Sequence, residues 1–343
     1  MTALLRYIII LVLLLPVCLY SCKKESTGIT GADMMQLPKG FPAMPEPENN
    51  RFSLERWTLG KQLFYDKRLS RNNTISCGSC HHAALAFSDS LAFSPGDGNA
   101  PGTSNAPSLA NIGYHPYFTR AGGVPTLEMQ VLVPVQEHNE FNTNMIDIVN
   151  KLNADPAYMQ QAQEAYNRPL DAFVITRALA QFERSFISGS SAFDDYFNKG
   201  QQNALNESEK RGYALFVSTR TNCSGCHSGF NFTNYAFENN GLYLSYSDSG
   251  RMRFTQLPED RAKFKVPSLR NVALTAPYMH DGSISSLEAV VAHYNSGGQA
   301  HASKSSLVQP LHLTPGEKED IVNFLKSLTD YSFTRDKKFQ IEK

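Results

Sequence analysis

The sequence predicts a mainly α-helical protein built from two similar domains, and three observations support this prediction. Apolar residues recur at three- and four-residue spacing, which is typical of helices packed on a core. The pattern Cys-x-x-Cys-His occurs twice, at residues 77–81 and at residues 223–227. An amphipathic segment with a Leu-Phe step precedes each copy, at Leu63-Phe64 and at Leu215-Phe216. The two copies and their shared surroundings predict one domain for each motif.

The first 22 residues predict an export signal that ends in a lipid attachment site. Arg6 is followed by an apolar run at residues 7–15, which is too short to span a bilayer comfortably. The run leads into Leu19-Tyr20-Ser21-Cys22, which resembles the processing site of bacterial lipoproteins. We therefore expect a lipidated Cys22 and an exported body. An ordinary signal peptide cut elsewhere and an uncleaved anchor are the alternatives.

The remaining chain divides into a tether and two domains. Residues 23–50 are rich in glycine, proline and polar side chains, and predict a tether followed by an extended arm. We place the first domain at residues 51–200 and the second at residues 201–335. The 32 basic and 32 acidic residues cancel, without a long run of either sign. Nucleic acid is therefore not an expected partner.

Five segments carry the helical period most clearly, and two long stretches lack it. The last of the five has a clear start signal, because Thr314 is a capping residue and Pro315 stands at the first helical position. Residues 83–123 and 229–276 predict loops of a length that is uncommon in compact domains. Such loops can wrap around a large flat cofactor. The predicted helices cover residues 54–64, 172–187, 207–216, 287–294 and 317–328.

Each Cys-x-x-Cys-His motif has the spacing of an attachment site for c-type haem. Two thiols one helical turn apart can each form a thioether with a haem vinyl group, and the following histidine can ligate the iron. A redox dithiol needs no such histidine, and zinc would need both cysteine pairs brought together. The sequence therefore predicts two cytochrome-c-like haem domains with long haem-wrapping loops. The covalent haems are expected on Cys77, Cys80 and His81, and on Cys223, Cys226 and His227.

Longer ordered segments are more specific than either haem motif alone. They comprise Leu59-Gly60-x-x-Leu63-Phe64-x-Asp66-x-Arg68-Leu69-Ser70, Ile75-Ser76, Asn105-Ala106-Pro107-Ser108-Leu109, Val266-Pro267-Ser268-Leu269-Arg270-Asn271 and Ala276-Pro277-Tyr278-Met279-His280-Asp281-Gly282. Through these segments the chain resembles the bacterial diheme cytochrome c peroxidases, including their MauG-like members. The resemblance runs from about residue 38 to about residue 329.

The resemblance implies that the N-terminal haem binds hydrogen peroxide and the C-terminal haem accepts electrons from a donor. Peroxide cleavage needs an open haem face and a group that moves a proton from the near to the far oxygen. The family uses a glutamate for this, which the match places at Glu140, with Phe141 in place of the usual methionine. Gln130 corresponds to the glutamine of the distal pocket. His138 is the weaker candidate for the base.

The resemblance also bears on the outer ligands of the two irons. Many of these peroxidases close the first haem with a histidine from the following loop, but residues 83–114 contain none, and His115 is misplaced for that role. The first haem is therefore expected to be open in the oxidised protein. At the second haem, MauG-like members carry tyrosine where other peroxidases carry methionine, and this position falls on Tyr294. Met279 is the alternative ligand.

Two further positions are implied by the family pattern. Arg120 occupies the place of the tryptophan that the family commonly has between the haems, so Phe118 or Tyr117 would have to bridge them, or transfer is slower. The only tryptophan, Trp57, is expected in the core. The family binds calcium between its domains through oxygen ligands. The matching positions are Asn105, Thr275 and Pro277.

The sequence as a whole predicts a diheme peroxidase, held on the membrane by its lipid anchor and facing the periplasm. It would reduce hydrogen peroxide to water with electrons from a small cytochrome c, a cupredoxin or a quinol. A MauG-like oxidase that modifies a partner protein and a non-enzymatic diheme electron carrier are the alternatives. A homodimer is among the assemblies that the resemblance allows.

Overall fold

The structure is a computed structural model, and it describes residues 34–341 of the chain. The predicted signal peptide, Cys22 and the start of the tether therefore lie outside the described residues. Met35–Lys343 forms one compact unit. Across residues 34–341, none of the helices is both long enough and apolar enough to cross a membrane.

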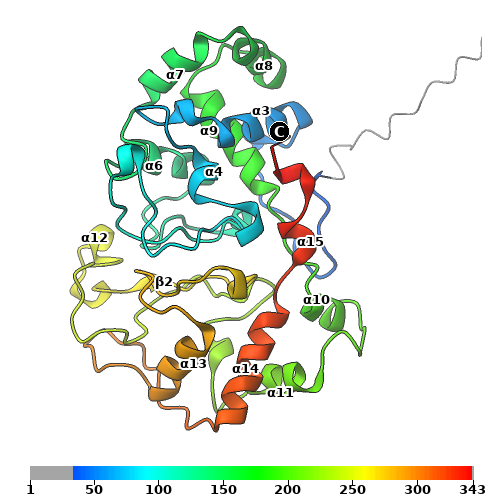
Figure 1. Cartoon of the computed structure of the whole chain (residues 1–343), viewed down its shortest axis with the longest axis vertical. Helices are drawn as coiled ribbons and strands as arrows, with labels where there is room; N and C mark the ends of the chain where they lie inside the picture. The colour runs from blue at the N-terminus through cyan, green and yellow to red at the C-terminus, as the bar shows by residue number, and fades with distance from the viewer. Residues whose placement is uncertain (1–33, 342–343) are drawn as a thin grey trace, which may run out of the picture. The chain divides into compact units, whose positions relative to one another are not determined.

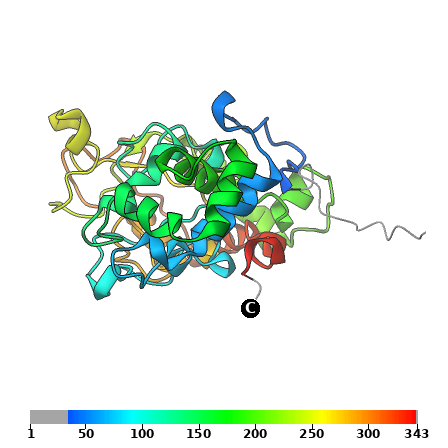
Figure 2. The ribbon, with the colours of Figure 1, turned by 90° about the horizontal axis from the view of Figure 1, so that it is seen from above.

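The N-terminal half of this unit is built around two helices, α3 and α9, which pack against each other (Figure 1). Both begin at a capping side chain, because Ser53 Oγ accepts from the backbone of Arg56 and Asp171 Oδ1 accepts from that of Val174. Seen from above in Figure 2, α7 and α8 lie over this pair. The helices are α3 (Leu54–Tyr65), α4 (Cys77–Cys80), α5 (Leu127–Gln130), α6 (Leu132–Gln136), α7 (Met145–Asn153), α8 (Pro156–Tyr166) and α9 (Ala172–Arg184).

The C-terminal half is built around α11 and α14 in the same way. A capping box starts each helix, formed by Asn206 with Glu209 and by Thr314 with Glu317, and Pro315 occupies the first turn of α14. The helices of this half are α10 (Ala192–Phe197), α11 (Glu207–Phe216), α12 (Met252–Thr255), α13 (Leu287–Ser296) and α14 (Pro315–Ser327), and α15 (Tyr331–Thr334) follows where the chain returns to the N-terminal half.

One glycine in each half lets its main helix pair approach closely. A Cβ atom on Gly60 of α3 would lie 2.0 Å from the carbonyl oxygen of Ala178 in α9. A Cβ atom on Gly212 of α11 would lie 1.9 Å from the carbonyl oxygen of Asp320 in α14. Both distances are far inside van der Waals contact, so any larger residue would force the helices apart.

The loops between the helices contain short turns and one small sheet. The strands β1 (Phe237–Glu238) and β2 (Phe264–Lys265) pair antiparallel, with Phe237 opposite Lys265. The 3₁₀ turns are η1 (Glu48–Asn50), η2 (Lys67–Leu69), η3 (Ala83–Leu85), η4 (Asp97–Asn99), η5 (Ile112–Tyr114), η6 (Cys223–Gly225), η7 (Pro258–Asp260), η8 (Val272–Leu274) and η9 (Lys337–Phe339).

The loops of the two halves repeat each other in detail. Asn111 and Asn271 both adopt a left-handed backbone, with φ of 58° and 59°. The backbone N–H of Asn111 donates to Phe186 after α9, and that of Asn271 donates to Leu328 after α14. Each asparagine thereby fixes its loop to the end of the helix that covers it. The two halves are thus two copies of one arrangement.

A buried hydrogen bond and the C-terminal segment tie the halves together. Asn111 Nδ2 in the N-terminal half donates to Asn231 Oδ1 in the C-terminal half at 3.0 Å. After α14, the chain runs back to the N-terminal half (Figure 1), where Phe339 packs against the rings of Phe87, Phe182 and Phe186.

The prediction of a mainly helical fold is confirmed. All five predicted helices are present, and the helix at Glu207–Phe216 has the predicted ends. The predicted loop at 229–276 also contains α12, β1 and β2, which the sequence did not indicate. Trp57 lies in the core, where its indole N–H donates to Ser185 Oγ at 2.8 Å.

Candidate active site

The first cysteine pair lies on α4, a single helical turn that faces α3. The backbone of Ser76 donates to Ser79 Oγ at 3.0 Å, which closes the start of this turn. A Cβ atom on Gly78 would lie 2.3 Å from the ring of Tyr65, so this position needs a glycine. Because the turn is short and pressed against α3, both thiols are presented on one side.

The histidine of each motif is oriented by a backbone carbonyl. His81 Nδ1 lies 2.6 Å from the carbonyl oxygen of Phe87, and His227 Nδ1 lies 3.0 Å from that of Phe232. A carbonyl accepts only from a protonated nitrogen, so Nε2 of each ring keeps its lone pair. Burial lowers the pKa of both imidazoles below the usual value. Both rings are thereby prepared as neutral Nε2 ligands for a metal.

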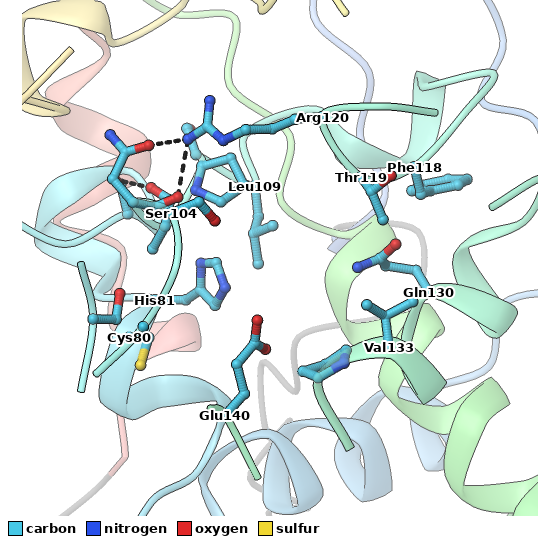
Figure 3. A pocket seen from close by; sticks show the side chains of 18 of the residues that line it. Cys80, His81, Ser104, Leu109, Phe118, Thr119, Arg120, Gln130, Val133 and Glu140 are labelled. Atoms are coloured by element: carbon cyan, nitrogen blue, oxygen red, sulfur yellow. Dashed lines mark hydrogen bonds between the residues drawn. The ribbon is translucent and has the colours of Figure 1, made fainter. Parts of the chain in front are cut away.

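A cavity of about 800 Å³ adjoins the first motif, and the predicted distal residues line it. Cys77, Cys80 and His81 form one wall, and Gln130 and Glu140 lie across from them. Figure 3 shows the Glu140 carboxyl pointing into the space between His81 and Gln130. The structure therefore brings together these five residues, which the sequence places up to 63 positions apart.

Glu140 is held in place through its backbone. Its carbonyl oxygen accepts from Asp97 N at 2.8 Å, and a Cβ atom on Gly96 would lie 2.1 Å from the carbonyl oxygen of Asn139. The carboxyl itself makes no hydrogen bond to another side chain within residues 34–341, which leaves it free to act in the cavity. Burial, and then the negative charge of Glu137, raise the pKa of Glu140 above its usual value.

The two other distal candidates lie differently. Gln130 ends α5, and its buried Oε1 has no hydrogen-bond partner among the described residues. An unpartnered buried amide oxygen on a cavity wall indicates a ligand or water in that cavity. His138 does not line the cavity; its Nδ1 lies 3.0 Å from Asn142 Oδ1 on the surface. The geometry thus favours Glu140 over His138.

At the second motif, both candidate iron ligands lie near Asn240. Met279 Sδ accepts from Asn240 Nδ2 at 3.2 Å. Tyr294, on α13, packs against the same core as Cys223. Burial raises the pKa of the Tyr294 phenol, and a hydrogen bond from Asn240 opposes this shift. The structure thus brings Tyr294 and Cys223 to the same hydrophobic core.

A cluster of cations lines the cavity on the side toward the C-terminal half. The Arg120 guanidinium donates to the backbone oxygen of Asn105 at 2.9 Å and to the Asn105 side chain. Figure 3 shows these bonds to the loop that follows Ser104. Lys265 Nζ donates to the carbonyl oxygen of Tyr117 at 2.6 Å and lies 3.2 Å from His115 Nδ1. Phe118 is buried, whereas Tyr117 is 43% exposed.

The positions predicted to bind calcium are close together but bond to each other and to Arg120. Asn105 Nδ2 donates to the carbonyl oxygen of Pro277 at 2.7 Å, while its Oδ1 accepts from Arg120. The hydroxyl of Thr275 donates to Val272 O at 3.2 Å. The Asn105 oxygen that would ligate calcium therefore faces the guanidinium of Arg120, a cation that repels a calcium ion.

Sequence reasoning missed two titratable groups in this cavity, Glu183 and Lys265. Burial raises the pKa of Glu183 to about 8, because the charge of Arg184 only partly offsets it and Glu128 adds to it. Glu183 lies near the end of α9, on its buried face. A charged residue among the apolar residues of a predicted helix was the signal that could have identified it. Lys265 lies in the unpatterned loop, where the sequence offered no signal.

The residues of this cavity fit a covalently bound haem. Two thiols lie beside a histidine whose Nε2 is free to ligate iron, and the buried cations Arg120 and Lys265 can pair with the haem carboxylates. Burial raises the pKa of Cys77 and Cys80, so both thiols are neutral near pH 7. The second motif repeats the cysteines and the oriented histidine.

Comparison with known proteins gives the class of this chain. Residues 54–203 match the family described as di-haem cytochrome c peroxidase, and residues 209–329 match cytochrome c. The chain is 34% identical to the methylamine utilization protein MauG of Methylorubrum extorquens, over 90% of this chain and 89% of that protein. It is 32% identical to the cytochrome c551 peroxidase of Pseudomonas aeruginosa, over 89% of each.

The chain therefore belongs to the di-haem cytochrome c peroxidase family, and carries two c-type haems. A solved structure agrees: a MauG-like protein associated with microbial copper homeostasis is 36% identical and superposes with a TM-score of 0.84. That match covers 89% of this chain and 98% of the other. The predicted family is thus confirmed.

Proposed function

We propose that this di-haem peroxidase reduces hydrogen peroxide to water at the haem of the first motif, with electrons that enter through the haem of the second motif. The observation that carries this assignment is the pairing of Glu140 and Gln130 across one cavity from Cys77, Cys80 and His81. The bound haems supply the iron that binds peroxide and the electrons that reduce it. The protein supplies the proton transfer and the positioning.

Glu140 performs the proton transfer that peroxide cleavage requires. Its carboxylate takes the proton from the oxygen nearer the iron and returns it to the farther oxygen, which then leaves as water. Two electrons and two further protons complete the reduction to two water molecules. The raised pKa of Glu140 suits this exchange, because a base with a pKa nearer neutrality also releases its proton readily. Gln130 orients the peroxide through its unpartnered amide oxygen.

Replacing Glu140 by glutamine tests this role. Glu140→Gln keeps the size and polarity of the side chain but cannot carry the proton, so peroxide turnover should fall by ~10²-fold or more. Both haem absorption spectra should stay nearly unchanged. The matched control is His138→Gln, which alters a neighbouring residue outside the cavity and should leave turnover intact. Unchanged turnover in Glu140→Gln would show that Glu140 does not carry the proton. A loss of turnover in His138→Gln would assign the proton transfer to His138.

Tyr294 is proposed as the outer ligand of the second iron, because it packs from α13 against the core on which Cys223 also packs. This position favours a second candidate function, a MauG-like oxidase that modifies a partner protein. Arg120, in the place of the family's tryptophan between the haems, weakens that candidate. Peroxide consumption that requires a partner protein and no donor cytochrome would favour it over the peroxidase.

The partners and the location follow from the same proposal. A small cytochrome c, a cupredoxin or a quinol delivers the electrons on the periplasmic side, and lipid on Cys22 holds the protein to its membrane. A mature N-terminus with a free amino group downstream of Cys22, found by mass spectrometry, would contradict the anchor. A homodimer is the proposed assembly, and a monomeric mass in analytical ultracentrifugation would exclude it.

A further inference from the structure

Between the two halves lies the position at which the family resemblance implies a calcium ion. Asn105 lies there, 6% exposed, in the loop of the N-terminal half. Its Nδ2 donates to the carbonyl oxygen of Pro277 in the C-terminal half at 2.7 Å. Its Oδ1 and its backbone oxygen both accept from Nη2 of Arg120. One amide group thus joins Arg120 to the opposite half.

The orientation of this amide is decided by its two neighbours. If it were flipped, Nδ2 would face the N–H groups of Arg120 and two donors would be opposed, while Oδ1 would face the oxygen of Pro277. In the orientation observed, the Asn105 oxygen accepts from Arg120 and the Pro277 oxygen accepts from Asn105. A calcium ion bound to these two oxygens would have to stand beside the Arg120 guanidinium and displace the Asn105 amide from Pro277.

The charges around Asn105 oppose a second cation. Arg120 and Lys265 line the same cavity, and burial together with the charge of Arg120 lowers the pKa of Lys265 to about 8. Asp281 and Asp248 are the side chains whose negative charges act on Arg120. Both carboxylates already have partners, because Asp281 accepts from Tyr243 and Asp248 accepts from Arg253. A calcium ion would therefore meet the positive charge of Arg120, and these two carboxylates already hold other partners.

We propose that this protein binds no calcium between its halves, and that the guanidinium of Arg120 is a built-in cation that takes the place of the ion. Arg120 holds Asn105, and Asn105 holds the Pro277 loop. This inference does not depend on which substrate the protein reduces.

The test is a calcium titration of the full-length holoprotein. Samples dialysed against EGTA and then against calcium chloride are compared by elemental analysis and by the midpoint of thermal unfolding. The proposal predicts no stoichiometric calcium in either sample and the same unfolding midpoint in both. One calcium ion per chain after dialysis against calcium buffer, or a midpoint that falls in EGTA, would overturn it.

Variants test whether Arg120 stabilises the contact between Asn105 and the Pro277 loop. In EGTA, Arg120→Ala should lower the unfolding midpoint, and Arg120→Lys should restore part of the loss because it keeps a charge near Asn105. The matched control is Arg251→Ala, which removes an arginine that bonds to Ala121 and Gly122 in the same loop but not to Asn105. Equal losses in Arg120→Ala and Arg251→Ala would refute the role of Arg120. If Arg120→Ala does not fold, the calcium titration of the unmodified protein still decides the proposal.

Discussion

At the scale of single residues, the pH dependence of catalysis should follow the charge next to Glu140. Glu140 acts first as a base, so activity is present above its pKa and lost as the pH falls through it. Burial and the charge of Glu137 raise that pKa. Glu137→Gln removes the charge, and the acid limb of kcat/KM should move to lower pH.

The control for this shift is Glu164→Gln, which removes an exposed carboxylate on α8 that bonds only to Gln160 in the described structure. Its pH profile should match that of the unmodified protein. An acid limb that stays in place in Glu137→Gln would show that another group sets the profile.

The ligand of the second iron gives a spectroscopic prediction. With the phenol oxygen of Tyr294 as ligand, the oxidised protein should lack the long-wavelength absorption band that methionine sulfur gives. Tyr294→His should change the spectrum of this haem while both haems stay attached. Met279→Leu is the comparison and should leave the spectrum unchanged. A spectrum that responds to Met279→Leu and not to Tyr294→His would establish methionine ligation instead.

The site residues that could be predicted from the sequence belong to short motifs with a fixed spacing. The haem cysteines and histidines follow from a five-residue pattern, and Glu140 follows from a family match. Glu183 and Lys265 could not be found this way. Each becomes part of the cavity only because helix α9 and the loop before Pro267 fold back onto it, and no local pattern records that approach.

At the scale of elements, the helix pairs are expected to be sensitive to one methyl group. Gly212→Ala places a Cβ atom against the Asp320 carbonyl in α14, a rigid backbone group, and should lower the free energy of unfolding by about 1–3 kcal/mol. Chemical denaturation of the holoprotein measures this. Gly316→Ala is the matched control on α14, where the new Cβ atom meets nothing within 4 Å.

Gly316→Ala should leave stability unchanged or raise it by about 0.5–1 kcal/mol, because alanine loses less backbone entropy in a helix. Equal stabilities for the two variants would mean that the helices can separate at Gly212 without cost.

The helices that the sequence predicted differ widely in burial, because α9 buries ten of its thirteen residues and α11 only Gly212 and Phe216. The start of α11 is marked instead by its capping box. α8 was missed because its buried residues Tyr158, Ala162 and Ala165 stand among three glutamines, which gives a weak period. α10 is only six residues long, and its buried face depends on Phe193 and Asp194 meeting a distant loop.

At the scale of the whole molecule, the joints between the halves were outside the reach of sequence reasoning. The hydrogen bond from Asn111 to Asn231 and the packing of Phe339 on Phe87 connect residues that are 120 or more positions apart. The two-fold repeat of the motifs predicted the existence of two halves. It gave no indication that the chain returns to the first half after α14.

The measurement that tests the central claim most directly is the stoichiometry of peroxide reduction. Purified holoprotein is supplied with a reduced small cytochrome c and known amounts of hydrogen peroxide, and oxidation of the donor is followed by absorbance. Reduction of peroxide to two water molecules takes two electrons, so two donor molecules should be oxidised for each peroxide consumed. Donor oxidation that does not depend on peroxide, or none when peroxide is added, would contradict the assignment.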